Sequence, residues 1–360
     1  MNDLSDLCLA QRVLTTLMRG EPTRPGDIKA LMELLLRGSL KEKTQFTCGA
    51  LLTLLMCPPG PRLEALEELS EALACISQPN PRVELAGRIP VAVVGSGKDE
   101  LKTFNVSTCA SLVAVACGAT VAKVGCGAET SAAGTTDVLS GLGLDPLPPF
   151  VRSMMALKSC GFAVFATEVE LPELFSIYIG RTPVFTALEY VLPCYIGIDI
   201  DTVVYGLSDP RTELAGHLLR KHKRTGVIVA GTSNCGAAID ELSVLGPSVV
   251  TRVMLGEIET FTVMPTDLGF YTIFADEDIA PGATIEEAIQ IAARILQGHG
   301  NAAQNAMVAA NAAAILWAGG ITRSLQEGIE IALEAICTGA GWRVLEKART
   351  ILAPRREEKP

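Results

Sequence analysis

The sequence predicts an α/β protein, with a small all-helical N-terminal domain beside a larger α/β domain that has a central mixed sheet flanked by helices. Residues 1–85 show helical periodicity alone, and residues 90–124 alternate between strand and helix patterns. A hairpin-like stretch at 249–263 precedes a helix-rich end from 284 to 350. With 360 residues and 49% hydrophobic composition, the chain can bury a large core divided between two domains.

The helical domain is expected over residues 1–80, joined by part of 165–190, and the α/β domain over 81–360. The turn-rich segment 77–90 is a plausible linker between them. Apolar residues recur at three- and four-residue spacing within the first domain, and Pro and Gly stand at the expected ends. This pattern predicts four helices, over 7–20, 25–38, 42–56 and 61–76.

The α/β domain is predicted to begin with a strand, a glycine loop, a helix and a second strand. The strand "PVAVVGSG" (90–97) ends in glycines, "STCASLVAVACGA" (107–119) is a helix of small side chains, and "TVAKV" (120–124) is the next strand. Such a unit implies a parallel pair with a ligand-binding crevice at the carboxyl ends of the strands. "GVIVAG" (226–231) continues the strand signal, and 249–263 is predicted to turn around Leu255 to Glu257.

Charge and composition narrow the class of partner. A formal charge of −10 and a pI near 5.0 disfavour nucleic acid and anionic membranes as partners. Eleven cysteines without metal-type spacing indicate reduced thiols, and the acidic N-terminus without a long apolar run predicts a cytoplasmic protein. The basic run at 220–224 is expected to be a solvated helix end, and His217, His222 and His299 to lie at the surface.

The segment "VVGSGKDELKTFNVST" (93–108) has the features of an anion-binding loop. Gly95 and Gly97 allow close backbone approach, while Asn105 and the hydroxyls after it begin a helix whose free N–H groups attract anions. The alternative is a plain strand-to-helix turn in which these polar residues only cap the helix.

Two familiar phosphate-binding patterns do not fit this loop. A Walker A loop requires Gly at 92 and Ser or Thr at 99, but the sequence has Ala92 and Asp99. A dinucleotide-binding fingerprint requires Gly at position 100, which is Glu100.

Three segments resemble the anthranilate phosphoribosyltransferase family, within glycosyltransferase family 3 and the type II nucleoside phosphorylase superfamily. They are "GSGKDE" (95–100), "TFNVST" (103–108) and "KVGC" (123–126), which are similar to that family's glycine loop, Thr-Phe-Asn-x-Ser-Thr motif and lysine loop. Further segments follow in family order. These are "DVLSGLG" (137–143), "IDELS" (239–243), "PTDLGF" (265–270) and 311–339.

The resemblance implies an enzyme that binds phosphoribosyl pyrophosphate (PRPP) with Mg²⁺ and lets an amine displace pyrophosphate. Mg²⁺ would be held by Ser107, Asp240 and Glu241, and hard oxygen ligands suit this ion. No residue is assigned to proton transfer. The expected PRPP-binding residues are Gly95, Lys98, Asp99, Thr103, Asn105, Val106, Ser107, Thr108, Lys123, Thr130, Ser131 and Thr135.

The acceptor side departs from the family pattern. Val124, Cys126 and Gly127 stand where the family has His, Asn and Arg. A buried acceptor carboxylate without a partner would cost several kcal/mol, on the order of 2 to 7 for a buried polar group. The sequence therefore predicts an amine or aromatic or heteroaromatic acceptor other than, or in addition to, anthranilate. Cys126 and Arg181 are the expected acceptor contacts.

Two alternatives remain open from the sequence. One is a pentosyltransferase of the pyrimidine nucleoside phosphorylase type, in which inorganic phosphate replaces pyrophosphate. The other is a non-catalytic homologue that binds a phosphosugar or nucleic acid, the latter disfavoured by the acidic pI. The resemblance also implies a homodimer formed through the helical domains.

Overall fold

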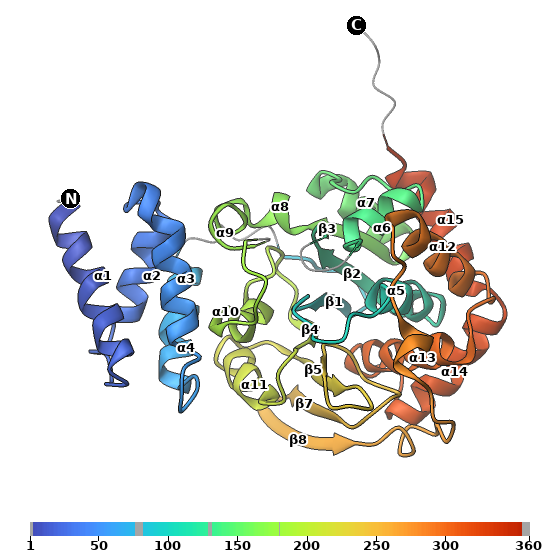
Figure 1. Ribbon diagram of the computed structural model, residues 1–360. Coiled ribbons are helices and arrows are strands. Elements are labelled where there is room, and N and C mark those ends of the chain that lie inside the picture. The colour runs from blue at the N-terminus through green and yellow to red at the C-terminus, as the bar shows by residue number, and fades with distance from the viewer. Residues whose placement is uncertain (1–2, 76–81, 129–131, 180, 355–360) are drawn as a thin grey trace, which may run out of the picture.

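The computed structural model describes residues 3–75, 82–128, 132–179 and 181–354 (Figure 1). It confirms the predicted class, since a central mixed sheet is flanked by helices and four further helices stand at one side. Within these ranges, no helix is both long and apolar enough to cross a membrane.

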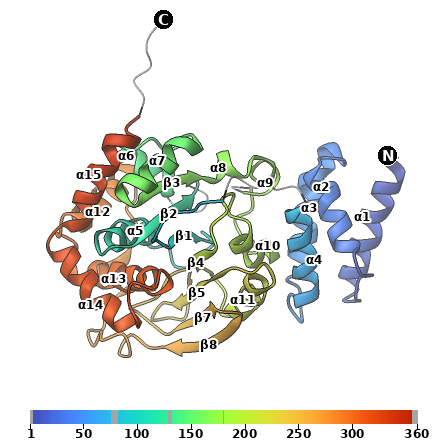
Figure 2. The same ribbon diagram turned by 180° about the vertical axis from the view of Figure 1, so that it is seen from behind.

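The first four α-helices confirm the four predicted from periodicity. Each is amphipathic or apolar, and Leu31, Leu51 and Leu69 are completely buried among them. Figures 1 and 2 show the group beside the sheet-containing body, with α1 farthest from it. The helices are α1 (Asp3–Met18), α2 (Asp27–Leu36), α3 (Thr44–Leu54) and α4 (Leu63–Ala74).

The sheet has the order β3-β2-β1-β4-β5-β7-β8, with β6 paired to β5. The pairs from β3 to β5 along this order are parallel, while β7 and β8 form the predicted antiparallel hairpin at one edge. The strands are β1 (Pro90–Gly95), β2 (Thr120–Gly125), β3 (Phe162–Ala166), β4 (Thr202–Gly206), β5 (Thr225–Thr232), β6 (Ala238–Ile239), β7 (Ser248–Met254) and β8 (Glu257–Val263).

Helices cover both faces of the sheet. On one face α5 packs against β1 and β2, and α13 packs against α5, β4 and β5; small side chains such as Ala110 and Ala114 permit this close approach. On the other face α11 lies on β5, β7 and β8. The helices after α4 are α5 (Val106–Ala116), α6 (Thr135–Gly141), α7 (Phe150–Cys160), α8 (Thr167–Glu170), α9 (Pro172–Ile177), α10 (Ala187–Val191), α11 (Thr212–Lys221), α12 (Ile285–Leu296), α13 (Ala302–Ala318), α14 (Leu325–Cys337) and α15 (Ala340–Leu352).

The basic run at 220–224 is not simply solvated, which corrects the expectation from sequence. Lys221 Nζ lies 3.0 Å from carboxylate oxygens of both Glu67 and Glu71 on α4, because that helix presents its acidic face here. The half-buried His222 ring is 3.0 Å from Ser70 Oγ, so it is not a plain surface residue either.

These contacts and the packing of α9 and α10 against α2, α3 and α4 connect the helical group to the rest of the chain. We propose that the helical domain ends at residue 80 and that part of 165–190 belongs to it.

The strand order places a crevice between β1 and β4. The chain proceeds from β1 to β2 and β3 in one direction, and from β4 to β5 in the other. The loops after β1 and β4 therefore separate at the carboxyl edge of the sheet, where open α/β sheets bind their ligands.

Candidate functional site

A cavity of about 150 Å³ lies at this carboxyl edge. We call it the donor cavity. It lies beside the beginning of α5, and residues from the loops after β1, β2 and β6 surround it. Its lining residues are Gly95, Ser96, Gly97, Asp99, Lys102, Thr103, Phe104, Asn105, Ser107, Lys123, Val124, Gly125, Cys126, Gly127, Ala133, Gly134, Thr135, Asp240 and Glu241.

Two glycines let Asp240 enter this crevice. A Cβ at Gly206, the last residue of β4, would lie only 1.7 Å from the Asp240 carbonyl oxygen, and one at Gly95 would lie 2.6 Å from Asp240 Oδ2. The Asp240 carboxylate also accepts a hydrogen bond of 2.8 Å from the backbone N–H of Gly97. The glycine loop and the β6 loop are thus fixed against each other.

Asp99, Asp240 and Glu241 form one carboxylate cluster, with ligand atoms within 4.8 Å of one another. Burial, and next the negative charge of Asp240, hold the pKa values of Asp99 and Glu241 well above their usual range. Glu241 is 7% exposed, and its Oε2 atom has no hydrogen-bond partner among the described residues. The cluster therefore brings three carboxylates together, and the nearby Lys123 and Lys102 offset their mutual repulsion only in part.

The cluster fits a Mg²⁺ ion. An unpartnered buried carboxylate oxygen, two further carboxylates within reach and the nearby Ser107 hydroxyl offer the hard oxygen ligands that this ion prefers. Cation binding would also relieve the repulsion between the carboxylates.

The beginning of α5 supplies polar groups to the opposite side of the cavity. Asn105 precedes the helix but makes no side-chain cap, and its Nδ2 instead donates to the Ala133 carbonyl at 3.2 Å. The alternative in which Asn105 only caps the helix is therefore wrong. Ser107 in the first turn lines the cavity, where the free N–H groups of the helix favour an anion.

Lys123 on β2 is the buried cation of this site. It is 2% exposed, and its Nζ donates to the carbonyl of Val124 at 2.9 Å. Burial lowers the pKa of Lys123 to about 8, against the opposing attraction of Asp240 and Glu241. A phosphate group would restore the stability of the charged form.

The loop after β2 is held by two acidic side chains. Glu168 Oε1 accepts from the Gly127 N–H at 3.0 Å, and Asp137 Oδ2 accepts from the N–H groups of Ala128 and Gly134 at 2.8 Å. The conformation of this loop is therefore held through its backbone N–H groups. In the family pattern, large polar side chains stand at the positions of Val124, Cys126 and Gly127.

The structure brings most of the predicted site residues together, as the lining of the donor cavity shows. The predicted residues in it are Gly95, Asp99, Thr103, Asn105, Ser107, Lys123, Cys126, Thr135, Asp240 and Glu241. Thr130 and Ser131 lie outside the described residues. None of the three histidines lines the cavity within the described part of the chain.

Four predicted residues do not line the donor cavity. Val106 and Thr108 are buried at 0% and 1% exposure, because their positions in α5 face the core. Arg181 is exposed, so its guanidinium is not part of the cavity wall. The Lys98 ammonium turns away from the cavity and donates to the Thr182 carbonyl at 2.7 Å.

Sequence reasoning missed three contributors to the site. Lys102 lines the cavity beside Thr103, and its charge within the quoted loop was the available signal. The hydroxyls of Ser96 and Ser208 form a hydrogen bond of 2.8 Å, and the Ser208 hydroxyl donates to Asp99 Oδ1 at 3.0 Å. Ser208 follows β4, and no motif marked it.

The fold and site define an α/β protein with groups for an anion and a metal cation in one crevice at the carboxyl edge of its sheet, and comparison with known proteins specifies the family. The a/b domain of the glycosyl transferase family matches residues 88–342. The anthranilate phosphoribosyltransferase of Parasynechococcus marenigrum (strain WH8102) is 31% identical over 348 residues, covering 95% of both chains. The chain therefore belongs to the anthranilate phosphoribosyltransferase family within these glycosyl transferases.

Solved structures agree with this assignment. The anthranilate phosphoribosyltransferase from Thermus thermophilus superposes with a TM-score of 0.79 at 27% identity, covering 94% of this chain and 99% of that one. The enzyme from Saccharomyces cerevisiae in complex with PRPP and Mg shares the fold, with a TM-score of 0.74 at 19% identity over 95% of this chain and 97% of that one.

Proposed function

We propose that this protein is a Mg²⁺-dependent phosphoribosyltransferase that transfers 5-phosphoribose from PRPP to an aromatic or heteroaromatic amine, other than or in addition to anthranilate. The observation that carries the proposal is the Asp99–Asp240–Glu241 cluster, which shares one cavity with Lys123 and the beginning of α5. A diphosphate and its metal need anion-binding and cation-binding groups in this proximity.

The side chains divide the work of binding the donor. The N–H groups at the start of α5, together with Asn105, Ser107 and Lys123, would hold phosphate oxygens. Ser107, Asp240 and Glu241 would hold Mg²⁺, which would supply charge neutralisation to the departing diphosphate.

The transfer exchanges one bond for another at the anomeric carbon. The amine nitrogen forms the new C–N bond while the C–O bond to pyrophosphate breaks, and the proton that the nitrogen releases passes to the departing pyrophosphate. Buried walls such as Val124 and Phe104 would limit access of water to the sugar centre. Positioning and electrostatic stabilisation therefore account for the proposed rate enhancement.

The acceptor proposal rests on Val124, Cys126 and Gly127. Val124 and Cys126 offer the acceptor side an isopropyl group and a thiol, and Gly127 offers only its backbone, which Glu168 engages. These groups do not supply the amide and guanidinium of the family pattern, which supports an altered acceptor range.

A pyrophosphate-release assay with PRPP, Mg²⁺ and a panel of aromatic and heteroaromatic amines tests the proposal. We expect release that depends on both the amine and Mg²⁺. Phosphate-dependent cleavage of a pyrimidine nucleoside would instead establish the phosphorylase alternative. Calorimetric binding of PRPP without turnover of any amine would establish a non-catalytic binding protein.

We also propose that the protein is a cytoplasmic homodimer. Sedimentation analysis of the purified protein tests the oligomeric state.

A further inference from the structure

Ser208 connects the loop after β4 to the carboxylate cluster. It lies two residues past the end of β4, and its hydroxyl donates to Asp99 Oδ1 at 3.0 Å. Its Oγ also lies 2.8 Å from Ser96 Oγ. Among the described residues, Ser208 is not one of those that line the donor cavity. Its hydroxyl therefore acts on the cluster from outside the space that a cation or a substrate would occupy.

The turn that carries Ser208 is fixed on both sides. Before it, the Leu207 N–H donates to the Val229 carbonyl at 2.8 Å. After it, Asp209 Oδ1 accepts from the backbone N–H and from Nε of Arg211, both at 2.9 Å. The hydroxyl is thus presented to the glycine loop by a turn whose conformation its own hydrogen bonds determine.

Ser96 extends this connection to a second carboxylate. Its hydroxyl lies 3.2 Å from Asp240 Oδ2, to which it can donate, and its backbone N–H donates to the Gly206 carbonyl at 2.9 Å. The pair of serine hydroxyls thus connects Asp99 to Asp240.

Each of these hydroxyls has a single proton to donate. The Ser208 proton is directed to Asp99 Oδ1, so the Ser96 proton serves both the contact between the hydroxyls and the Asp240 carboxylate. Without the Ser208 hydroxyl, Asp99 Oδ1 would keep the Asp240 N–H as its donor. Loss of Ser208 would therefore release Asp99 from the β4 loop.

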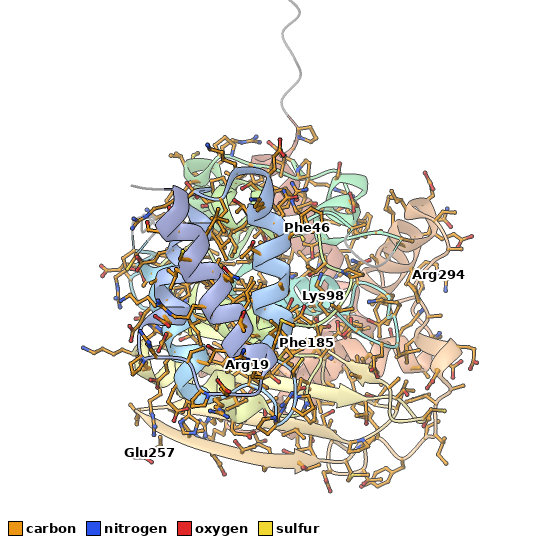
Figure 3. The ribbon with its side chains drawn as sticks, turned by 60° about the vertical axis from the view of Figure 1, so that its left-hand side comes forward. Arg19, Phe46, Lys98, Phe185, Glu257 and Arg294 are labelled. Carbon is orange, nitrogen blue, oxygen red and sulfur yellow. The ribbon has the colours of Figure 1, made fainter. Side chains whose placement is uncertain are left out.

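Little water screens these contacts. Ser96 and Asp240 are each 7% exposed. Figure 3, which looks from the side of α1–α4, places Lys98, the residue before Asp99, near the middle of the molecule. Hydrogen bonds to a carboxylate are stronger in such surroundings than in water, so the serine hydroxyls can fix the direction of the carboxylates they contact.

The direction of these carboxylates matters for a metal cation. Mg²⁺ requires oxygen ligands in nearly ideal octahedral geometry at about 2.0–2.1 Å. The ligand atoms of Asp99, Asp240 and Glu241 lie within 4.8 Å of one another, and without a cation their negative charges repel. Donors behind the ligands hold them together against this repulsion.

We propose that Ser208 is a positioning residue, which acts through Asp99 to set the affinity of the carboxylate cluster for a divalent metal cation. This inference rests on the proposed transferase function, and it adds to that function the residue that controls its metal requirement. The β4 loop thus contributes to the metal site without supplying a ligand.

Titration with Mn²⁺ in the absence of PRPP tests this role. Mn²⁺ takes the same kind of oxygen ligands as Mg²⁺, and electron paramagnetic resonance measures its unbound form. We expect Ser208→Ala to weaken Mn²⁺ binding by about tenfold, the lower end of the effect of such partners of metal ligands. In the pyrophosphate-release assay, the Mg²⁺ concentration at half-maximal turnover should rise by a similar factor.

Two further variants separate the hydrogen bond from a general structural effect. Ser208→Thr keeps the hydroxyl and should retain most of the Mn²⁺ affinity. Thr225→Ala is the matched control, because Thr225 Oγ1 lies 3.1 Å from Thr202 Oγ1 where β5 and β4 begin, at the opposite edge of the sheet. It removes a comparable contact between hydroxyls and should leave the Mn²⁺ affinity unchanged.

A double-mutant cycle tests the route through Asp99. Asp99→Ala removes the acceptor of the Ser208 hydroxyl, so adding Ser208→Ala to it should weaken Mn²⁺ binding less than Ser208→Ala does alone. Equal effects in the two backgrounds would refute the action through Asp99.

The outcomes distinguish this inference from the proposed function. Mn²⁺ binding that depends on Ser208, without pyrophosphate release from any amine, would refute the transferase and support the role of Ser208. Pyrophosphate release together with a Mn²⁺ affinity that Ser208→Ala leaves unchanged would support the transferase and refute the role of Ser208.

Three other results would also overturn the inference. They are a wild-type protein that does not bind Mn²⁺, a Thr225→Ala variant that binds it as weakly as Ser208→Ala, and a Ser208→Thr variant that does not recover the affinity. Circular dichroism checks each variant, and loss of the fold in Ser208→Ala would show a general structural role in place of the proposed one.

Discussion

The Asp99 carboxylate accepts a hydrogen bond from the backbone N–H of Asp240 at 2.6 Å, across a sequence separation of 141 residues. This contact connects the glycine loop after β1 to the carboxylates after β6. The same Asp99 oxygen accepts from Ser208 at 3.0 Å, so the loop after β4 joins them. One carboxylate thus organises three loops at the crevice and adds its charge to the cluster.

We predict that Asp99→Asn separates these two roles. The amide oxygen can still accept both hydrogen bonds, but the negative charge is removed. Burial and Asp240 raise the pKa of Asp99, so its contribution to stability is lost as the pH rises from the unfolded aspartate pKa of about 3.9 to the higher folded pKa. At neutral pH the variant without Mg²⁺ should therefore be more stable than the wild-type protein.

Thermal denaturation with and without Mg²⁺ measures this effect. The variant should gain less stability from Mg²⁺ than the wild-type protein, and its turnover should need more Mg²⁺. A lower melting temperature of Asp99→Asn in the absence of metal would contradict this account of the cluster.

The combined variant Asp240→Asn with Glu241→Gln should abolish Mg²⁺-dependent turnover while leaving the fold intact. Both carboxylates are buried at 7% exposure, and a neutral amide oxygen holds Mg²⁺ less tightly than a charged carboxylate does. Circular dichroism checks the fold, and pyrophosphate release checks the activity. Full activity in this variant would remove both residues from the mechanism.

PRPP binding should weaken as the pH rises past the folded pKa of Lys123. Burial lowers this pKa to about 8, so affinity should fall about tenfold between roughly pH 7 and 9 as the ammonium deprotonates. The stability of the protein without PRPP depends on pH in the opposite direction. The unfolded state holds the proton up to an ordinary lysine pKa of about 10.4. Between the folded pKa of about 8 and this value, the deprotonation of Lys123 therefore increases the stability of the folded state as the pH rises.

Calorimetry of PRPP at several pH values measures this dependence. Lys123→Arg, which stays charged throughout the range, serves as the control and should flatten the profile. An affinity for PRPP that is constant from pH 7 to about 9 in the wild-type protein would exclude Lys123 as the phosphate partner.

Restoring the family's acceptor residues with Cys126→Asn and Gly127→Arg should improve the use of a carboxylated aromatic amine. A Cβ at Gly127 has its nearest neighbour at 3.7 Å, so the position has room for the start of a side chain. The ratio of kcat/KM for anthranilate to that for 2-aminobenzamide should rise by about tenfold, the gain from one added charge-assisted contact. An unchanged ratio would show that acceptor selection lies elsewhere.

Gly206→Ala should disrupt the crevice, because its Cβ would lie 1.7 Å from the Asp240 carbonyl. Overpacking of this kind costs about 1 to 3 kcal/mol and would displace the carboxylate cluster. Gly49→Ala in α3 is the control, since its Cβ meets nothing within 4 Å. Urea denaturation should show a loss for the first variant and none for the second. Equal stability of both variants would refute the close approach of Asp240 to β4.

The sequence predicted those parts of the fold whose signals are local. The glycine-ended β1, the small-residue α5 and the β7–β8 hairpin all follow from periodicity and turn residues. By contrast, β3 (Phe162–Ala166) and β4 (Thr202–Gly206) were not predicted. Both are short and completely buried, so they have no alternation to distinguish a strand from part of a buried helix.

The candidate site shows the same division. Asn105, Ser107 and Lys123 were found because they lie in short segments that resemble the family's motifs, and these segments belong to one crossover unit. The direction of the Lys98 side chain depends on Thr182, and the position of Asp99 depends on Ser208 and Asp240. These partners are remote in sequence, and only the folded chain brings them together.

Calorimetric titration of the wild-type protein with PRPP, in the presence and absence of Mg²⁺, tests the central claim most directly. We predict binding with Mg²⁺ that weakens at least about tenfold without it, because the carboxylate cluster then repels the diphosphate. Failure to bind PRPP with Mg²⁺, or an affinity that the metal does not change, would contradict the account.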